Sequence, residues 1–310
     1  MNKITHVNAK TIDEAVAALG PKAAIVAGGT DIVSSMKAMI FANPPEQLVS
    51  INKIPAMDYI KEEGGILKIG ALAKLVDIYE STVVQGKWSS LAEAAHLVAS
   101  PQIRNMGTIG GNLCQKVRCW YYRGEHNGFN CFRKGGDTCF GVAGDNRNLA
   151  ILGGQLCFAI CPSDTAIALA ALDATIVTTQ RSIAIKDFFI VLGNTLKDNE
   201  IVKEIQVPAP KAGTKQIFIK FADRKAIDFA VASVAVAISP TDARIVLGGV
   251  APIPYRATTA EDLVKGKTID AATAEAAGSE AVKRAIPQSQ NQYKVQITRT
   301  LVKRALLAAK

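Results

Sequence analysis

GTIGGN at residues 107–112 and AGGTDI at residues 27–32 are two glycine-rich segments of similar composition. Glycine adopts positive φ angles and lets a ligand approach the backbone closely, so successive N–H groups can face one anion. Thr30, Thr108 and Asn112 add side-chain donors beside the glycines. Together the two segments predict a site for a dinucleotide pyrophosphate between two lobes. Either one alone is also typical of a tight turn, and neither matches the GxGxxG or Walker pattern.

The segments around these loops mix helices and strands without a regular βαβ order. Strands are expected at 23–26, 48–51, 66–70, 174–179 and 199–208, and helices at 11–20, 74–80, 90–98 and 164–172. Thr11 is the expected N-cap of the first helix, and Ser90 with Glu93 forms a candidate capping box. Beyond residue 215, long strand-like runs precede two helices at 268–286 and 292–308, the first of them alanine-rich. This pattern predicts a separate C-terminal α+β unit.

Composition indicates an ordinary globular protein of two or three domains. The chain has 310 residues, of which 49% are hydrophobic and 20% charged. Polar segments at 52–63 and 208–215 are candidate boundaries. No apolar run approaches the ~20 residues of a membrane span, and the N-terminus lacks the features of a signal peptide, so we expect a cytoplasmic protein.

The formal net charge of +9 is compatible with an acidic partner subunit or simply a solvated surface. Basic residues are dispersed and are not interleaved with stacking aromatics. A nucleic-acid partner is therefore not expected.

All six cysteines lie between residues 114 and 161. Cytoplasmic thiols stay reduced, so a cluster of them favours metal or redox chemistry over disulfides. Cys119, Cys131 and Cys139 occupy a polar, glycine-containing stretch with several Arg and Lys residues. Four thiolates on an iron–sulfur cluster concentrate negative charge, which basic side chains offset. The stretch therefore favours an iron–sulfur site.

The fourth ligand is less well defined by the sequence. Cys157 is the first candidate and Cys161 the alternative, while Cys114 and Cys161 have apolar neighbours that favour a core position. Structural zinc and disulfides stay open as competing interpretations. The intervals of 11, 7 and 17 residues between the four candidates lack the C-x2-4-C spacing of zinc knuckles. His126 is expected to face solvent.

Four separated motifs resemble one known family, and they cover nearly the whole chain in order. They are AGGTDI (27–32), SPQIRNMGTIGGNL (100–113), CPSDTAIALAALDA (161–174) and KFADRKAIDFA (220–230). Together they resemble the medium, FAD-binding subunit of the molybdenum hydroxylases, the group of xanthine dehydrogenase and carbon monoxide dehydrogenase. The resemblance implies an α+β fold with a two-lobed FAD-binding domain of the PCMH, or vanillyl-alcohol-oxidase-like, type. Lobe 1 would span 1–58, lobe 2 would span 59–178, and an α+β C-terminal domain with a sheet and helices would span 179–310.

The same resemblance implies which residues bind FAD. Those for the pyrophosphate are Ala27, Gly28, Gly29, Thr30, Asp31, Thr108, Gly110, Gly111 and Asn112. Asp164 of the SDTA motif would contact FAD, Lys220 would lie by the flavin, and Val202 is a further candidate. No catalytic residue is implied in this chain, because the substrate site of the family is on a partner subunit.

The segment from about 114 to 157 departs from most family members, which run almost directly from TIGGN to the SD motif. It resembles the insertion of the 4-hydroxybenzoyl-CoA reductase beta subunit, which carries a [4Fe-4S] cluster. By position the ligands would be Cys119, Cys131, Cys139 and Cys157. The intervals around Cys131 and before Cys157 differ from those expected of that enzyme.

The resemblance further implies an electron-transfer subunit in a dimer of heterotrimers. Its partners would be a molybdopterin-binding large subunit, a [2Fe-2S] small subunit and a ferredoxin-like carrier, with electrons flowing inward. One alternative is a xanthine, CO or aldehyde dehydrogenase-type subunit that passes electrons outward to NAD or a quinone. Another is a zinc-stabilised nucleotide-binding module.

Overall fold

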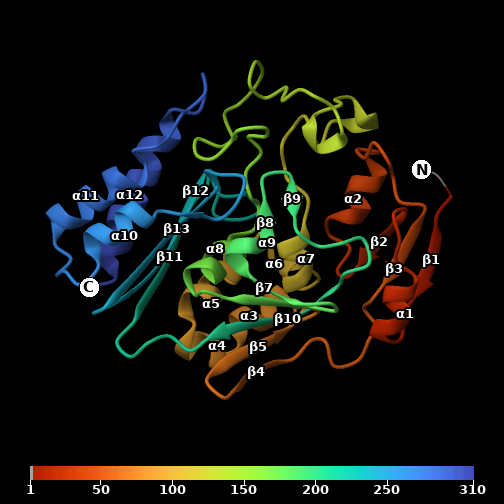
Figure 1. The fold of residues 1–310 in the computed structure, drawn as a ribbon, viewed down its shortest axis with the longest axis horizontal. Coiled ribbons are helices and arrows are strands. Elements are labelled where there is room, and N and C mark those ends of the chain that lie inside the picture. The colour runs from red at the N-terminus through yellow and green to blue at the C-terminus, as the bar shows by residue number, and fades with distance from the viewer. Residues whose placement is uncertain (1–2) are drawn as a thin grey trace.

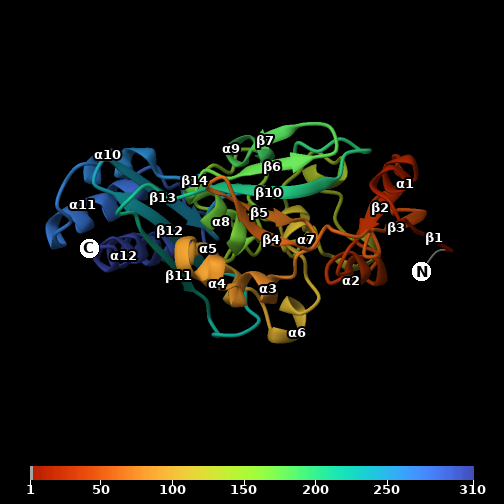
Figure 2. The same cartoon turned by 90° about the horizontal axis from the view of Figure 1, so that it is seen from below.

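The computed structural model describes residues 3–310, which form three units in a row (Figures 1 and 2). The N-terminal lobe, drawn in red, lies at one end and the C-terminal unit, drawn in blue, at the other. A middle lobe lies between them. Within the described residues no helix is both long and apolar enough to cross a membrane.

A small parallel sheet with the order β1-β3-β2 forms the N-terminal lobe. Its elements are β1 (Thr5–Asn8), α1 (Ile12–Ala17), β2 (Ala23–Val26), α2 (Ile32–Lys37) and β3 (Gln47–Ser50). The helix and the two strands expected in this region are confirmed. Thr11 caps α1, because its hydroxyl accepts the N–H of Glu14 at 3.1 Å. Helix α2, which the sequence pattern does not predict, begins directly after the first glycine loop.

The middle lobe is built on a five-stranded antiparallel sheet with the order β4-β5-β10-β6-β7. Its strands are β4 (Ile60–Glu63), β5 (Ile66–Gly70), β6 (Thr175–Thr178), β7 (Ser182–Ala184) and β10 (Val202–Pro208), with a small hairpin of β8 (Phe189–Ile190) and β9 (Gly193–Asn194). Strand β10 is central: Ile205 pairs with Ile69 of β5 and Ile176 of β6. Residues 179–208 therefore lie in the middle lobe, and the boundary expected after residue 178 is wrong. The polar linker after Pro208 divides the two units instead.

Seven short helices surround this sheet. They are α3 (Leu75–Glu80), α4 (Thr82–Lys87), α5 (Ser89–His96), α6 (Pro101–Arg104), α7 (Ile109–Cys114), α8 (Asp164–Ala171) and α9 (Ile185–Phe188). The helices expected at 74–80, 90–98 and 164–172 are confirmed. The capping box is wrong: Trp88 occupies the N-cap of α5 without a side-chain hydrogen bond. Ser90 instead donates to Gln216 at 3.2 Å, a residue of the C-terminal unit.

Residues 115–160, here called the cysteine segment, connect α7 to α8. The segment contains only two short 3-10 turns, Glu125–Asn127 and Phe132–Lys134. In Figure 1 it crosses the top of the view in yellow-green, from beside α2 toward the C-terminal unit. It has a small hydrophobic core of its own, formed by Ile40, Val117, Tyr122, Cys131, Cys157 and Ala159. Ile40, three residues after the end of α2, joins this core to the N-terminal lobe.

The C-terminal unit is an antiparallel sheet packed against three helices, of which the sequence predicts the sheet and the last two helices. Its elements are β11 (Lys215–Phe221), β12 (Ala232–Ser239), β13 (Asp242–Gly248), β14 (Tyr255–Arg256), α10 (Thr258–Val264), α11 (Ala271–Ala281) and α12 (Tyr293–Ala308). The strand order is β11-β12-β13-β14. Helix α10 is the one helix of the unit that the sequence analysis does not predict.

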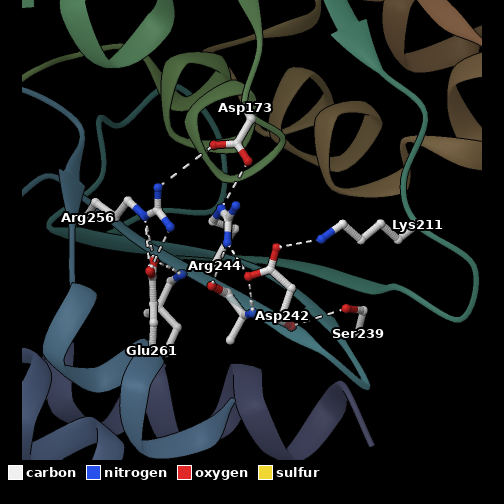
Figure 3. A network of polar contacts seen from close by, with 9 residues as sticks. Asp173, Lys211, Ser239, Asp242, Arg244, Arg256 and Glu261 are labelled. Atoms are coloured by element: carbon white, nitrogen blue, oxygen red, sulfur yellow. Dashed lines mark hydrogen bonds and ion pairs between the residues drawn. The ribbon is translucent and has the colours of Figure 1, made fainter. Parts of the chain in front are cut away.

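A polar network connects the end of α8 to this C-terminal sheet (Figure 3). Asp173, which follows α8, accepts a hydrogen bond from Arg244 of β13 at 3.0 Å. Arg256 pairs with Glu261 at 2.9 Å, and Glu261 also accepts the N–H of Ile245 at 2.9 Å. Because Glu261 is buried, these partners supply the hydrogen bonds that its carboxylate would otherwise make with water.

The C-terminal end of the cysteine segment is held by α12 and the residues before it. Asn291 donates to the carbonyl oxygens of Asn146 and Leu149 at 3.1 and 3.2 Å. Lys294 donates to the carbonyl oxygens of Leu149 and Gly249 at 3.0 and 2.6 Å. Asn146, Asn291 and Lys294 are each 0% exposed, so the contact is fully buried.

Candidate functional site

The first glycine loop, residues 27–31, connects β2 to α2. Gly29 has φ of +72°, a left-handed conformation that glycine adopts at little cost. Across the described residues, no group accepts a hydrogen bond from the backbone N–H of Gly28, Gly29 or Thr30. Three successive free donors in a partly exposed loop are suited to the oxygens of a phosphate group.

The second glycine loop uses its amides differently. Thr108 is the N-cap of α7, and its hydroxyl accepts the N–H of Gly111 at 3.2 Å. The N–H of Gly110 is donated to the carbonyl oxygen of Ala71 at 3.0 Å. A Cβ on Gly110 would lie 3.0 Å from Ala71, so this glycine serves close packing. The expectation that both loops present free amides is therefore wrong for Gly110 and Gly111.

The two loops nevertheless meet in space, as the sequence analysis expects. A Cβ on Gly28 would lie 2.0 Å from the carbonyl oxygen of Met106, so only glycine allows this contact. A Cβ on Gly107 would lie 3.8 Å from the hydroxyl of Thr30. The free amides of the first loop thus lie beside the second loop, at the boundary of the two lobes.

Asn112 connects the second loop to the start of α8. Its side-chain oxygen accepts hydrogen bonds from Ser163 at 2.5 Å and Thr165 at 2.7 Å. Ser163 also caps α8 by accepting the N–H of Ala166 at 3.1 Å. This buried network fixes the orientation of the Asn112 amide.

Asp164 and Lys220, both expected near FAD, pair with each other. Their side-chain atoms are 2.7 Å apart, and the side chains are 7% and 6% exposed. Lys220 also donates to the carbonyl oxygen of Leu97 at 2.9 Å. Burial raises the pKa of Asp164, and the ion pair with Lys220 opposes this effect. Val202 is different: its side chain is buried in the main core, so only its backbone is available to a ligand.

Asp31 is expected at the pyrophosphate, but its carboxylate contacts the cysteine segment. It accepts the N–H of Lys116 at 2.8 Å and pairs with Arg123 at 2.6 Å and Arg118 at 3.0 Å. These three residues lie 85 to 92 positions away in the chain. Arg118 and Arg123 lie near Cys119 in the sequence, but nothing in the local pattern indicates their pairing with Asp31.

Four cysteines line one pocket in the cysteine segment. The lining residues are Cys119, Tyr121, Tyr122, Cys131, Phe132, Arg133, Cys139, Phe140, Gly141, Leu156, Cys157 and Ala159. The four are those expected from the sequence as cluster ligands. The guanidinium of Arg133 donates to the sulfur of Cys157 at 3.1 Å. Within residues 3–310, no three His, Cys, Asp or Glu side chains are grouped as ligands of a single metal ion.

A second positive charge, that of Lys134, lies close to the pocket, 5.6 Å from the centre of the Tyr122 ring. The ammonium of Lys134 is buried, and no described residue accepts a hydrogen bond from it. Burial lowers the pKa of Lys134, whereas negative charge on Cys131 and Cys119 raises it. An isolated buried ammonium is costly unless an anion lies near it. Positive charge therefore lies close to two of the cysteines that line the pocket.

The remaining two cysteines lie outside the pocket. Cys161 belongs to the main core, and Cys114 packs against it. Burial raises the pKa of Cys161 to about 12 and that of Cys114 to about 11. Both thiols thus stay protonated, as expected of core residues. His126 is exposed, as expected.

Comparison with known families agrees with this architecture. The FAD binding domain in molybdopterin dehydrogenase matches residues 2–119 and 138–210, and the CO dehydrogenase flavoprotein C-terminal domain matches residues 217–309. The chain therefore belongs to the FAD-binding flavoprotein subunits of the molybdenum-containing oxidoreductases. Residues 120–137, which include Cys131, fall outside the match.

Individual relatives define the type more closely. The aldehyde oxidoreductase FAD-binding subunit PaoB of Escherichia coli is 35% identical over 78% of this chain and 79% of its own length. The carbon monoxide dehydrogenase medium chain of Hydrogenophaga pseudoflava is 32% identical over 97% of this chain and 94% of its own length. A solved structure of carbon monoxide dehydrogenase from the same organism superposes with a TM-score of 0.78 at 30% identity, covering 99% of this chain and 97% of that chain.

Proposed function

We propose that this chain is the FAD- and [4Fe-4S]-containing electron-transfer subunit of a molybdenum hydroxylase complex. Its partners would be a molybdopterin-binding large subunit, where substrate is oxidised, and a [2Fe-2S] small subunit. Electrons would leave through this chain to an acceptor. The relatives are named as an aldehyde oxidoreductase and a carbon monoxide dehydrogenase, which supports outward flow better than the inward flow expected from the sequence.

The two glycine loops would hold the FAD. Bound FAD accepts electrons in pairs and releases them singly, which the chain itself cannot do. The free amides of Gly28, Gly29 and Thr30 would bind the diphosphate, while Thr108, Gly110 and Gly111 would position the second loop. The amide of Asn112 would reach the ligand from its fixed orientation. Asp164 and Lys220 would face it as a paired group, without net charge.

One observation carries the cluster proposal: four cysteines line one pocket together with Arg133, whose guanidinium donates to the sulfur of Cys157. Cys119, Cys131, Cys139 and Cys157 would be the ligands. Hydrogen bonds to sulfur and nearby positive charge stabilise the more negative, reduced state of such a cluster and raise its potential. Arg133 already donates to the sulfur of Cys157, so it would have this effect.

The cysteine pocket also supports a second candidate. An aroyl-CoA reductase of the 4-hydroxybenzoyl-CoA type would use the same two cofactors with electrons flowing inward from a ferredoxin-like carrier. Turnover of the assembled complex with aldehydes or with aroyl-CoA thioesters separates the two. A cluster potential well above that of the flavin would argue against inward flow, because the first carrier would retain the electrons.

The direct test is analysis of iron, acid-labile sulfide, zinc and flavin in anaerobically purified protein, with Cys139→Ser and Cys114→Ser as matched variants. We expect about four iron and four sulfide per FAD in the wild type and in Cys114→Ser. Cys139→Ser should lose most of the iron. Flavin without iron would leave the FAD subunit but contradict the cluster, and zinc would make the pocket a structural site. A colourless protein would contradict both cofactors.

A further inference from the structure

Asp31 lies between the two cofactor regions of the chain. Its backbone belongs to the glycine loop that presents free amides, and its carboxylate contacts Lys116, Arg118 and Arg123 of the cysteine segment. The carboxylate is only 19% exposed. Asp31 therefore connects the two proposed cofactor sites: its backbone is part of the first, and its carboxylate contacts the segment that contains the second.

Arg123 extends this link to the first cysteine of the pocket. Its guanidinium donates to Ser35 of α2 at 2.6 Å and to the carbonyl oxygens of Val117 at 2.8 Å and Lys116 at 3.0 Å. Its backbone N–H is donated to the carbonyl oxygen of Cys119 at 2.9 Å. Two residues, Asp31 and Arg123, thus connect the glycine loop to the backbone of Cys119.

Arg118 brings the C-terminal unit into the same network. Its guanidinium carbon lies 4.9 Å from the centre of the Phe229 ring, in the loop between β11 and β12. The Nε of Arg118 is buried, and no described residue accepts its hydrogen bond. Burial lowers the pKa of Arg118, and Asp31 opposes this effect. Asp31 therefore compensates the charge of two partly buried arginines.

Helix α2 supplies a second, apolar connection. It begins at the residue after Asp31, and the residues at its end pack against the core that contains Cys131 and Cys157. The carbonyl oxygen of Ala38 accepts the N–H of His126 at 3.0 Å. A displacement of the glycine loop would thus move residues that pack in the same hydrophobic cluster as Cys131 and Cys157.

We propose that Asp31 is a positioning residue that couples FAD binding to the state of the cysteine pocket. The proposal rests on the proposed function for the identity of the two cofactors. Occupation of either site stabilises the arrangement that the other needs, and such coupling is reciprocal by thermodynamic linkage. The carboxylate also contributes negative charge to the network that reaches the backbone of Cys119, so its removal should shift the cluster potential upward.

The test is the affinity of flavin-free full-length chain for FAD, titrated by flavin fluorescence in four proteins. These are the wild type, Cys139→Ser, Asp31→Asn and the double variant. In the wild-type background, Cys139→Ser should weaken FAD binding at least about 5-fold, the lower end of typical coupling. In the Asp31→Asn background the same change should weaken it less than about 2-fold. Equal weakening in both backgrounds would overturn the proposal.

Two further measurements keep the proposal testable. Arg123→Lys, which keeps the charge but not the planar fork, should abolish the coupling in the same way if Asp31→Asn does not fold. The cluster potential should rise in Asp31→Asn and stay unchanged in Asp145→Asn, whose carboxylate pairs with the exposed Arg147 of the same segment. An unchanged potential in Asp31→Asn would overturn the proposal.

Two outcomes separate the coupling from the proposed function. Wild-type protein without iron would contradict the proposed function itself. Iron-containing protein in which Cys139→Ser weakens FAD binding equally in both backgrounds would contradict only the coupling.

Discussion

The two ends of the cysteine segment are held by different kinds of contact. Residues 115–124, at the start, are held by ion pairs from Asp31 to arginines whose side chains are 18% and 29% exposed. Residues 145–152, at the end, are held by hydrogen bonds to Asn291 and Lys294, both 0% exposed. The start is thus connected to the glycine loop and the end to the C-terminal unit.

This difference separates two roles. Partly exposed ion pairs contribute modestly to stability, because water screens them, but they respond to nearby charge. Fully buried hydrogen bonds contribute more, since breaking one leaves a polar group without water. We therefore expect the end of the segment to determine stability and the start to determine the properties of the cofactor sites.

Asn291→Ala should have the largest effect on stability. The carbonyl oxygens of Asn146 and Leu149 would lose a donor, and the N–H of Gln288 would lose its acceptor at 2.7 Å. Because Asn146 and Asn291 are fully buried, the free energy of unfolding should fall by about 3 kcal/mol. Urea unfolding with an unchanged m-value measures this. If the unfolding free energy fell by less than about 1 kcal/mol, the end of the segment would not contribute more to stability than the start.

Because of Lys294, the unfolding free energy of the protein should depend on pH. Burial lowers its pKa to about 7 in the folded chain, whereas an unfolded lysine titrates near 10.4. Above pH 7 the unfolded state therefore binds a proton that the folded state does not, so folding becomes more favourable as pH rises. The wild type should gain about 1 kcal/mol relative to Lys294→Met per pH unit between 7.5 and 9.

The control for that comparison is Lys283→Met, because Lys283 is 70% exposed and pairs only with Glu280. Its unfolding free energy should follow that of the wild type across the same pH range. A difference between wild type and Lys294→Met that stays constant with pH would show that Lys294 remains charged when buried.

Arg123→Lys should have a smaller effect on stability than either change at the other end. A single ammonium cannot replace a guanidinium that donates to Asp31, Ser35 and two backbone carbonyls. We expect a loss of about 1 kcal/mol, because the site is partly solvated. Iron and flavin content should fall more than the unfolding midpoint does. If Arg123→Lys lowered the unfolding free energy as much as Asn291→Ala does and kept its full iron and flavin content, the start of the segment would determine stability instead.

Asp145→Asn should have the smallest effect. Its ion pair with Arg147, whose side chain is 61% exposed, lies on the outside of the segment. Isolated pairs of this kind contribute little, so the unfolding midpoint and cofactor content should both match the wild type. A clear loss of iron would show that the pocket depends on the outer turn as well.

Much of the fold follows from local patterns in the sequence. The long apolar run of β12 and the helical spacing of apolar residues in α12 are strong local signals, and both elements are predicted from them. The position of β10 was not predictable in this way, because its partners β5 and β6 are distant in the chain. Helix α10, with only seven residues, is too short for a clear period.

The site residues also fall into two groups, those that a local sequence pattern identifies and those that come together only in the folded chain. The glycines and the four cysteines can be recognised from their types and spacing, and the structure brings the cysteines to one pocket. The orientation of the Asp31 carboxylate cannot be recognised, because it depends on arginines that approach only in the folded chain. The use of the Gly110 amide by Ala71 is likewise a property of packing rather than of the local motif.

The central position of β10 has a consequence for biosynthesis. Because β10 pairs with both β5 and β6, the middle sheet lacks its inner strand until residues 202–208 have been translated. Cys119 to Cys157 leave the ribosome before that strand does. The thiols of the pocket are therefore synthesised into a lobe that is not yet closed, and they stay accessible until the lobe folds as a unit.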